Sequence, residues 1–316
     1  MRFRLFRFLL LVLAGLVSAC PAFAQPDLSQ KIGPTIADTG SEFYRFERFA
    51  MDSDDGGRHY KIAVGIPKAD VPEKGFPVLY MLDGNAALAA LDDKLFSRLS
   101  GTLPVIVTIG YDTELRFDVV SRAFDYTPAM PDGTQPKDER GRKGGGADVF
   151  AALIETKIKP KAESLVRIDK NRQAIWGHSY GGLFVLNTLF RHSEMFQNYI
   201  AVSPSLWQQR GAIFQYEKDF AAKEPKRDFR LLLFHGTDEK KAERTGDADN
   251  PVRQKMQDMR RSVPADAGRE LSLRLRTVLR ESEYAELKGL THGQTFGASL
   301  ETALRFIQNG GVTPSP

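Results

Sequence analysis

The chain has 316 residues, of which 42% are hydrophobic and 27% are charged, as in an ordinary globular domain and unlike a disordered or collagen-like chain. The formal net charge is +4, and the basic residues are scattered among 40 acidic ones, so the composition argues against a nucleic-acid-binding protein and fits an anionic small-molecule substrate better. The single cysteine is Cys20, so the rest of the chain can form no disulfide, cysteine nucleophile or cysteine metal site.

Residues 1–24 have the pattern of a signal peptide. Three arginines precede an apolar run, Phe8 to Val17, that is too short to span a bilayer, and Ala22 to Ala24 offer small residues for cleavage. The sequence therefore predicts export from a bacterial cytoplasm, to the periplasm or beyond. An alternative is lipidation of Cys20, which would attach the protein to a membrane; Pro21 favours cleavage after Ala24 instead.

Residues 25–42 form a lead without a clear pattern, and residues 43–316 are expected to form a single domain, because no linker composition interrupts them. Two strands, Phe43 to Ala50 and Arg58 to Pro67, should form a hairpin around an Asp- and Gly-rich turn.

Two continuous apolar runs, Phe76 to Leu82 and Pro104 to Gly110, predict parallel strands buried on both faces, joined by a helix over Ala86 to Leu99. The loop after the first strand is either a simple turn or, in a hydrolase, a source of an oxyanion donor. We expect that donor at the Asn85 backbone N–H or a neighbour, with Gly84 letting the chain approach a substrate.

Residues 111–146 are polar and lack periodicity, which is typical of a functional rim or a disordered excursion. The basic stretch 137–143 is interpreted as a solvated charge run, with direct substrate contact as the alternative. Arg122 and Asp125 are predicted to form an ion pair that holds the loop.

The pattern G-x-S-x-G occurs at Gly177 to Gly181, after a predicted helix over Ala147 to Leu165 and a buried strand over Arg172 to Trp176. An apolar helical spacing follows. Such a strand-to-helix turn lifts the hydroxyl of Ser179 to the edge of the sheet and places the Tyr180 N–H, at the positive end of the helix, where an oxyanion would form.

The later elements alternate in type and complete the prediction of an α/β fold, a mostly parallel, doubly wound sheet of about eight strands with helices on both faces. They are strands at Gln197 to Ser203 and Phe229 to Phe234, a helix at Asn250 to Arg261, an ambiguous segment at Arg269 to Leu279, a last strand at Tyr284 to Leu290 and a terminal helix reaching Ile307. Trp207, after one of these strands, could stack on an aromatic ligand or cap the core.

A serine hydroxyl is a weak nucleophile and needs a base that is itself oriented by a third group. His292 follows the last predicted strand, where the α/β-hydrolase chain order Ser, acid, His puts the base. Glu239 is favoured as the acid over Asp238, and a Ser-His dyad without an essential acid is the alternative. His178, beside the serine, would help to shape the site and is counted among the substrate-binding residues.

Four segments together resemble the esterase-D-like α/β-hydrolases, and the resemblance extends from Phe43 to Ile307. They are Gly177 to Phe184, Leu79 to Gly84, Gly145 to Phe150 and Ser203 to Trp207. Within that family the chain is similar to the periplasmic trilactone esterases that linearise ferric enterobactin and salmochelin.

The resemblance implies an α/β-hydrolase fold with Ser179 as nucleophile, His292 as base and Glu239 as acid, and with Arg122 contacting a catecholate or lactone oxygen. It predicts an exported serine carboxylesterase that needs no metal or organic cofactor and whose partner is a small-molecule ester, with any iron arriving in the siderophore substrate. The alternatives are a general acyl esterase or acyl transferase, and a siderophore-binding protein without catalysis.

Overall fold

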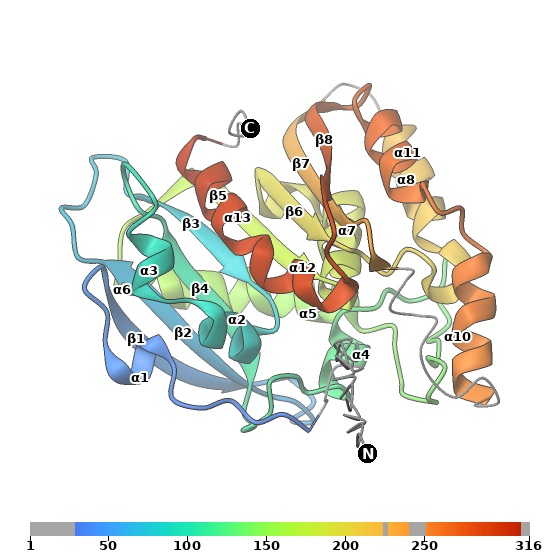
Figure 1. Ribbon diagram of the computed structural model, residues 1–316, viewed down its shortest axis with the longest axis horizontal. Coiled ribbons are helices and arrows are strands. Elements are labelled where there is room, and N and C mark those ends of the chain that lie inside the picture. The colour runs from blue at the N-terminus through green and yellow to red at the C-terminus, as the bar shows by residue number, and fades with distance from the viewer. Residues whose placement is uncertain (1–28, 224–226, 240–250, 311–316) are drawn as a thin grey trace, which may run out of the picture.

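One sheet organises the fold in the part of the chain that the computed structural model describes, residues 29–223, 227–239 and 251–310. Its eight strands follow the order β1-β2-β4-β3-β5-β6-β7-β8 (Figure 1). The strands are β1 (Tyr44–Asp52), β2 (His59–Pro67), β3 (Phe76–Met81), β4 (Val105–Tyr111), β5 (Ile168–His178), β6 (Asn198–Val202), β7 (Arg227–Gly236) and β8 (Leu279–Leu287).

The direction of the strands follows from the length of the connections between them. A short turn joins β1 to β2, so these two pair antiparallel, and β2 also pairs antiparallel with β4. Longer connections, most of them containing helices, separate the other strands, which pair parallel from β4 through β3, β5, β6 and β7 to β8. The predicted hairpin and the mostly parallel eight-stranded sheet are therefore confirmed.

Helices cover both faces of the sheet, because alternate residues of the central strands point to opposite sides. Tyr80 and Ile175 pack into one apolar cluster with α5 and α7, whereas Leu79 and Trp176 pack into the other with α2 and α13. The helices are α1 (Ile36–Thr39), α2 (Gly84–Ala90), α3 (Asp93–Phe96), α4 (Ser121–Asp125), α5 (Ala147–Leu153), η1 (Ile154–Ile158), α6 (Lys159–Leu165), α7 (Tyr180–Arg191), η2 (Ser193–Met195), η3 (Gln208–Gly211), α8 (Ile213–Ala221), α10 (Pro251–Arg261), α11 (Ala267–Leu275), α12 (His292–Ala298) and α13 (Leu300–Gln308).

Some predicted bounds are wrong. The helix expected over residues 86–99 is two short helices, because the Asp92 side chain accepts a hydrogen bond from the Leu95 N–H at 2.7 Å and starts α3 as a new helix. The ambiguous segment 269–279 is mostly helix α11, and the last strand begins at Leu279 and not at Tyr284. β8 was hard to predict because it is an edge strand rich in charged residues.

The polar segment 111–146 contains one short helix, α4, and is otherwise ordered by hydrogen bonds within the segment. Its basic stretch closes on itself, since Asp138 accepts hydrogen bonds from the Arg142 guanidinium and from the Arg140 and Arg142 N–H groups. Lys137 and Lys143 are paired by a short bridge. The stretch is therefore an ordered loop folded around the buried Asp138 carboxylate.

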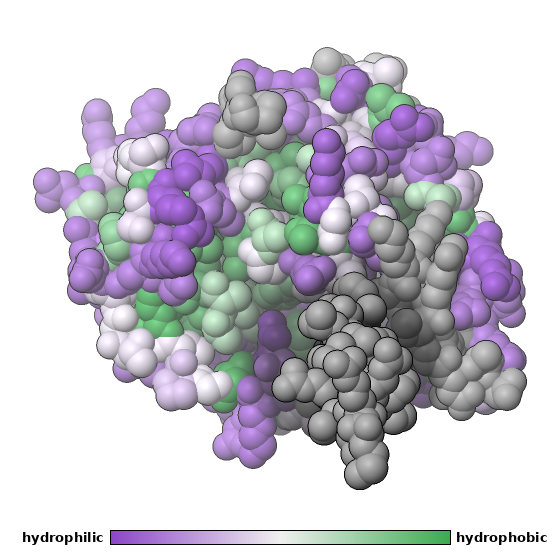
Figure 2. Space-filling view, in the orientation of Figure 1, coloured by the Kyte–Doolittle hydropathy of each residue, from purple (hydrophilic) through white to green (hydrophobic). Residues whose placement is uncertain are grey.

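The predicted signal peptide, including Cys20, lies outside the described residues. Within them, no helix has both the length and the apolar character needed to cross a bilayer. On the face that α12 and α13 cover, hydrophilic residues dominate the outline and hydrophobic residues show mainly toward the middle (Figure 2).

Candidate active site

Ser179 stands at the turn between β5 and α7 in a strained backbone conformation, with φ 60° and ψ −115°. The turn is held because the Ser179 N–H donates to the Val202 carbonyl at 2.9 Å and the Ser179 carbonyl accepts from the Ser205 N–H at 3.1 Å. A Cβ on Gly177 would lie 2.4 Å from the Gly181 carbonyl oxygen. Gly177 is therefore required by the close packing of strand against helix.

The Ser179 hydroxyl lies within hydrogen-bond distance of an imidazole from the far end of the chain. Ser179 Oγ is 3.0 Å from His292 Nε2, and His292 Nδ1 is 3.0 Å from Glu239 Oε2. His292 begins α12, where Thr291 and Gln294 form a capping box that fixes the start of the helix. Loops after β5, β7 and β8 thus bring a hydroxyl, a carboxylate and an imidazole into one hydrogen-bonded row.

Glu239 is buried and strongly hydrogen-bonded. Its Oε1 accepts from the Ser203 hydroxyl at 2.6 Å and from the Gly236 N–H at 2.9 Å. Burial acts to raise the pKa of Glu239, but the hydrogen bond and charge of His292, the charge of His235 and the Ser203 hydroxyl outweigh it and lower the pKa to about 2. An ionised Glu239 favours the His292 tautomer with hydrogen on Nδ1, which leaves Nε2 free to accept the serine proton.

The alternative acid, Asp238, occupies a different position in the same loop. Its backbone N–H donates to the Leu290 carbonyl at 3.1 Å, and it is the Glu239 carboxylate that accepts the hydrogen bond from the His292 ring. The geometry therefore favours Glu239 as the acid.

His178 holds the backbone of His292 in place. Its Nε2 lies 2.8 Å from the His292 carbonyl oxygen and 3.1 Å from the Thr295 hydroxyl, and the ring is buried. Burial first, and then the charge of His292, lowers the pKa of His178 well below its usual value, so the neutral ring donates from Nε2. The sequence suggested His178 among the substrate-binding residues; the buried, bonded ring corrects this to a supporting position.

The loop before α2 is fixed on the neighbouring strand. A Cβ on Gly84 would lie 2.5 Å from the Gly110 nitrogen, so the close approach expected at Gly84 is to β4 and not to an open surface. The Asn85 amide NH₂ group donates to three carbonyls, that of Tyr111 at the end of β4 and those of Thr113 and Leu115 after it. As in any helix, the backbone N–H groups of this first turn have no intrahelical acceptor, and the same holds for the Tyr180 N–H in the first turn of α7.

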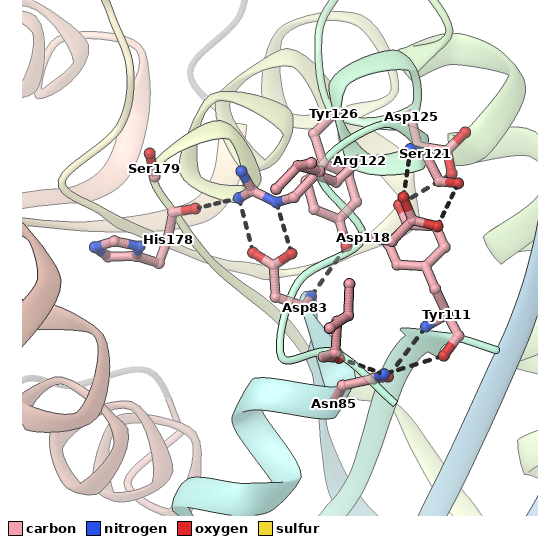
Figure 3. A network of polar contacts seen from close by, with 12 residues as sticks. Asp83, Asn85, Tyr111, Asp118, Ser121, Arg122, Asp125, Tyr126, His178 and Ser179 are labelled. Carbon is pink, nitrogen blue, oxygen red and sulfur yellow. Dashed lines mark hydrogen bonds and ion pairs between the residues drawn. The ribbon is translucent and has the colours of Figure 1, made fainter. Parts of the chain in front are cut away.

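The sequence predicted an ion pair between Arg122 and Asp125, but these two residues do not pair. The Arg122 guanidinium binds both carboxylate oxygens of Asp83, at 2.8 and 2.9 Å (Figure 3). Asp125 pairs instead with Arg58 at 2.9 Å and accepts hydrogen bonds from two buried tyrosine hydroxyls. The prediction was wrong because residues three apart in sequence were assumed to be partners, whereas the fold brings Asp83 from a distant strand end.

Trp207 is half-buried and packs against the apolar core. Its ring lies 6.4 Å from the Tyr180 ring, and the Arg260 guanidinium lies 5.1 Å from its centre. One face of the indole is thus already in contact with a cation. A nearby hollow of about 510 Å³ carries charges of both signs and includes Lys137 of the basic loop; it is lined by Met130, Lys137, Glu139, Gln209, Arg210, Pro251, Gln254, Lys255, Asp258 and Met259.

The sequence did not predict the residues that surround and support the hydrogen-bonded Ser179, His292 and Glu239 side chains. Ser205 places its hydroxyl 3.3 Å from the Ser179 hydroxyl, and Thr295 Oγ1 is 2.9 Å from the Ser203 hydroxyl. The sequence also predicted no role for Asp83, which lies in the segment Leu79 to Gly84. Serine, threonine and aspartate at strand ends are common in any turn, so they gave no signal of their own.

The chain is similar to known esterases. A family model described as putative esterase matches residues 53–307. The apo-salmochelin esterase of Escherichia coli O6:H1 is 48% identical over 194 residues, which cover 60% of this chain and 60% of that relative. The ferri-bacillibactin esterase BesA of Bacillus subtilis is 31% identical over 272 residues, covering 81% of this chain and 87% of BesA.

A solved structure of the enterobactin and salmochelin hydrolase IroE superposes with a TM-score of 0.66 at 37% identity. The match covers 87% of this chain and 99% of that structure. The residues matched by the family model, 53–307, include Ser179, Glu239 and His292.

Proposed function

Because this chain belongs to the putative esterase family, we propose that it is an exported serine carboxylesterase that hydrolyses the lactone esters of a ferric catecholate siderophore. The observation that carries the proposal is the hydrogen-bonded row of Ser179, His292 and Glu239, with 3.0 Å at each step. A hydroxyl, an imidazole and a carboxylate in this order are the parts that acyl transfer to serine requires.

In the proposed reaction, His292 Nε2 takes the hydroxyl proton as Ser179 Oγ attacks the lactone carbonyl. The resulting oxyanion accepts hydrogen bonds from the backbone N–H groups of Tyr180 and Asn85. The tetrahedral intermediate collapses, and His292 gives its proton to the leaving alkoxide. Water then attacks the acyl-enzyme with His292 again as base, which releases the acid and restores Ser179. Glu239 keeps the imidazole in the correct tautomer and stabilises its charged form.

The substrate class is proposed from the relatives. Their descriptions name salmochelin, bacillibactin and enterobactin, which supports a siderophore ester here. The proposed steps use side chains, backbone N–H groups and water, and iron would enter as part of the substrate.

Export is proposed from the first 24 residues. Mass spectrometry of the mature N-terminus tests it: a start at Gln25 indicates cleavage after Ala24, and a lipid on Cys20 indicates a membrane-anchored form. An intact Met1 in protein purified from the periplasm would contradict both.

The function is tested with the wild-type protein and Ser179→Ala on ferric enterobactin, iron-free enterobactin and a short p-nitrophenyl ester. We expect Ser179→Ala to reduce turnover of all three by at least about 10³-fold. Undiminished rates would remove Ser179 from the mechanism. Hydrolysis of the simple ester alone would identify a general acyl esterase, and tight siderophore binding without cleavage would identify a binding protein.

A further inference from the structure

Asp83 has a left-handed backbone conformation, which is uncommon for a residue other than glycine. Its φ of 50° and ψ of 47° lie in the left-handed region, immediately before α2. The residue is 2% exposed, and its N–H donates to the buried Tyr126 hydroxyl at 3.0 Å. This conformation decides where the first N–H groups of α2 point, among them the proposed oxyanion donor of Asn85.

Arg122 fixes the other end of Asp83. Two hydrogen bonds join the guanidinium to the carboxylate, and the same guanidinium lies 3.5 Å from the His178 carbonyl oxygen at the end of β5 (Figure 3). Its side chain is only 13% exposed. The cation is further enclosed by three aromatic rings at 5.4 to 5.6 Å, those of Phe117, Tyr126 and Tyr180.

Arg122 therefore touches both halves of the proposed oxyanion site. On one side it binds the residue before α2, and on the other it contacts the residues on either side of Ser179. The Asp83 carboxylate also lies against the start of α7, since its Oδ2 is 3.7 Å from where a Cβ on Gly181 would stand. An unpaired carboxylate at that place would repel the negative charge that forms on the substrate carbonyl.

We infer that Arg122 and Asp83 are a positioning pair for the oxyanion site, a role that rests on the proposed serine-esterase function. The pair holds the turn before α2 against the Ser179 turn, so that the two N–H donors keep a fixed separation. Arg122 also neutralises the Asp83 carboxylate beside the developing oxyanion. Arg122 acts through Asp83 and not by contact with the siderophore.

The competing role, direct contact of Arg122 with an anionic substrate, makes a different kinetic prediction. A contact residue would affect binding of the charged ferric siderophore and leave a neutral ester unaffected. A positioning residue lowers kcat for both, because the oxyanion forms in both reactions.

The test measures kcat and KM of Arg122→Gln, Asp83→Asn, the double variant and Arg122→Lys, on ferric enterobactin and on a neutral p-nitrophenyl ester. We expect Arg122→Gln to lower kcat about 10²-fold on both substrates, with KM within about twofold. The double variant should regain about tenfold in kcat, because no unpaired carboxylate remains. Arg122→Lys should be intermediate, since it keeps the charge and loses the two-pronged geometry.

Arg58→Gln is the matched control, because Arg58 and Asp125 are buried to the same degree, at 11% and 1% exposed against 13% and 1% for Arg122 and Asp83. It should lower the melting temperature similarly and leave kcat near the wild-type value. Melting curves of all variants confirm folding, and if Arg122→Gln does not fold, Arg122→Lys and the double variant carry the test.

The inference is overturned if Arg122→Gln keeps the wild-type kcat on the neutral ester, if only KM for the ferric substrate rises, or if Arg58→Gln loses kcat equally. These outcomes differ from failure of the proposed function, in which Ser179→Ala would retain full turnover.

Discussion

His178 Nε2 lies 2.8 Å from the backbone carbonyl of His292, so the residue before the proposed nucleophile holds the residue that carries the proposed base. The contact joins the end of β5 directly to the start of α12, across more than a hundred residues of sequence (292 − 178 = 114). Movement of either loop is therefore transmitted to the other, and the distance between Ser179 Oγ and His292 Nε2 depends on both.

Replacement of His178 by phenylalanine should impair turnover more than stability. The ring volume is retained while the donor to the His292 carbonyl is lost, so His292 becomes less well placed. We expect kcat to fall about tenfold with KM nearly unchanged. Steady-state kinetics on a p-nitrophenyl ester provide the measurement. His192→Phe is the control, because His192 pairs with Asp148 at the far end of α7. Equal kcat values for both variants and wild type would contradict the role given to His178.

The two candidate acids can be separated by parallel substitutions. Glu239→Ala removes the hydrogen bond to His292 Nδ1 and should lower kcat by about 10² to 10⁴-fold, whereas Asp238→Ala should keep most of the activity. Both variants change a carboxylate in the same loop, so each controls for the other. Full activity of Glu239→Ala would instead indicate a Ser-His dyad.

The low pKa of Glu239 predicts a specific loss of stability in acid. The folded-state pKa is about 2 and the ordinary value is 4.5, so ionised Glu239 stabilises the fold above pH 4.5, and this contribution disappears as pH falls from 4.5 to 2. The shift corresponds to about 3 kcal/mol at most. Urea denaturation between pH 7 and pH 3 should show a smaller loss of unfolding free energy on acidification for Glu239→Gln than for wild type.

Ser203→Ala provides the graded comparison for that experiment. It removes one hydrogen bond to Glu239 Oε1 and leaves His292 in place. Its loss of unfolding free energy on acidification should therefore lie between those of wild type and Glu239→Gln. Identical slopes for all three proteins would show that Glu239 does not titrate differently in the folded and unfolded states.

Gly177→Ala should destabilise the protein, because the new methyl group would meet the Gly181 carbonyl oxygen at 2.4 Å. We expect a loss of about 2 to 3 kcal/mol in the free energy of unfolding, together with loss of activity as Ser179 is displaced. Gly297→Ala in α12 is the control, since nothing lies within 4 Å of its added Cβ, and it should be neutral or slightly stabilising. Equal stabilities of the two variants would refute this account of the motif.

The sequence predicted those parts of the fold whose pattern is local. Continuous apolar runs marked β3 and β4 because central parallel strands are buried on both faces. The G-x-S-x-G motif marked the turn at Ser179 because no side chain fits at Gly177, against the Gly181 carbonyl. β8 was misplaced because its charged sequence does not resemble a buried strand.

Long-range partners could not be predicted in the same way. Arg122 and Asp83 are 39 residues apart, and nothing near Arg122 in the sequence points to that carboxylate. The supporting contacts of Ser205 and Thr295 likewise exist only after the strand ends converge. Proximity in sequence favoured Asp125, and the topology of the sheet decided otherwise.

The charged sequence of β8 also affects how the protein behaves in concentrated solution. β8 and β1 are the two outer strands of the sheet, and both carry charged side chains, Arg280, Glu281 and Glu283 on one and Arg45, Glu47 and Arg48 on the other. Charges on outer strands discourage a further chain from adding to the sheet by backbone pairing. Replacing them with valine or threonine would therefore promote aggregation without altering the chemistry at Ser179.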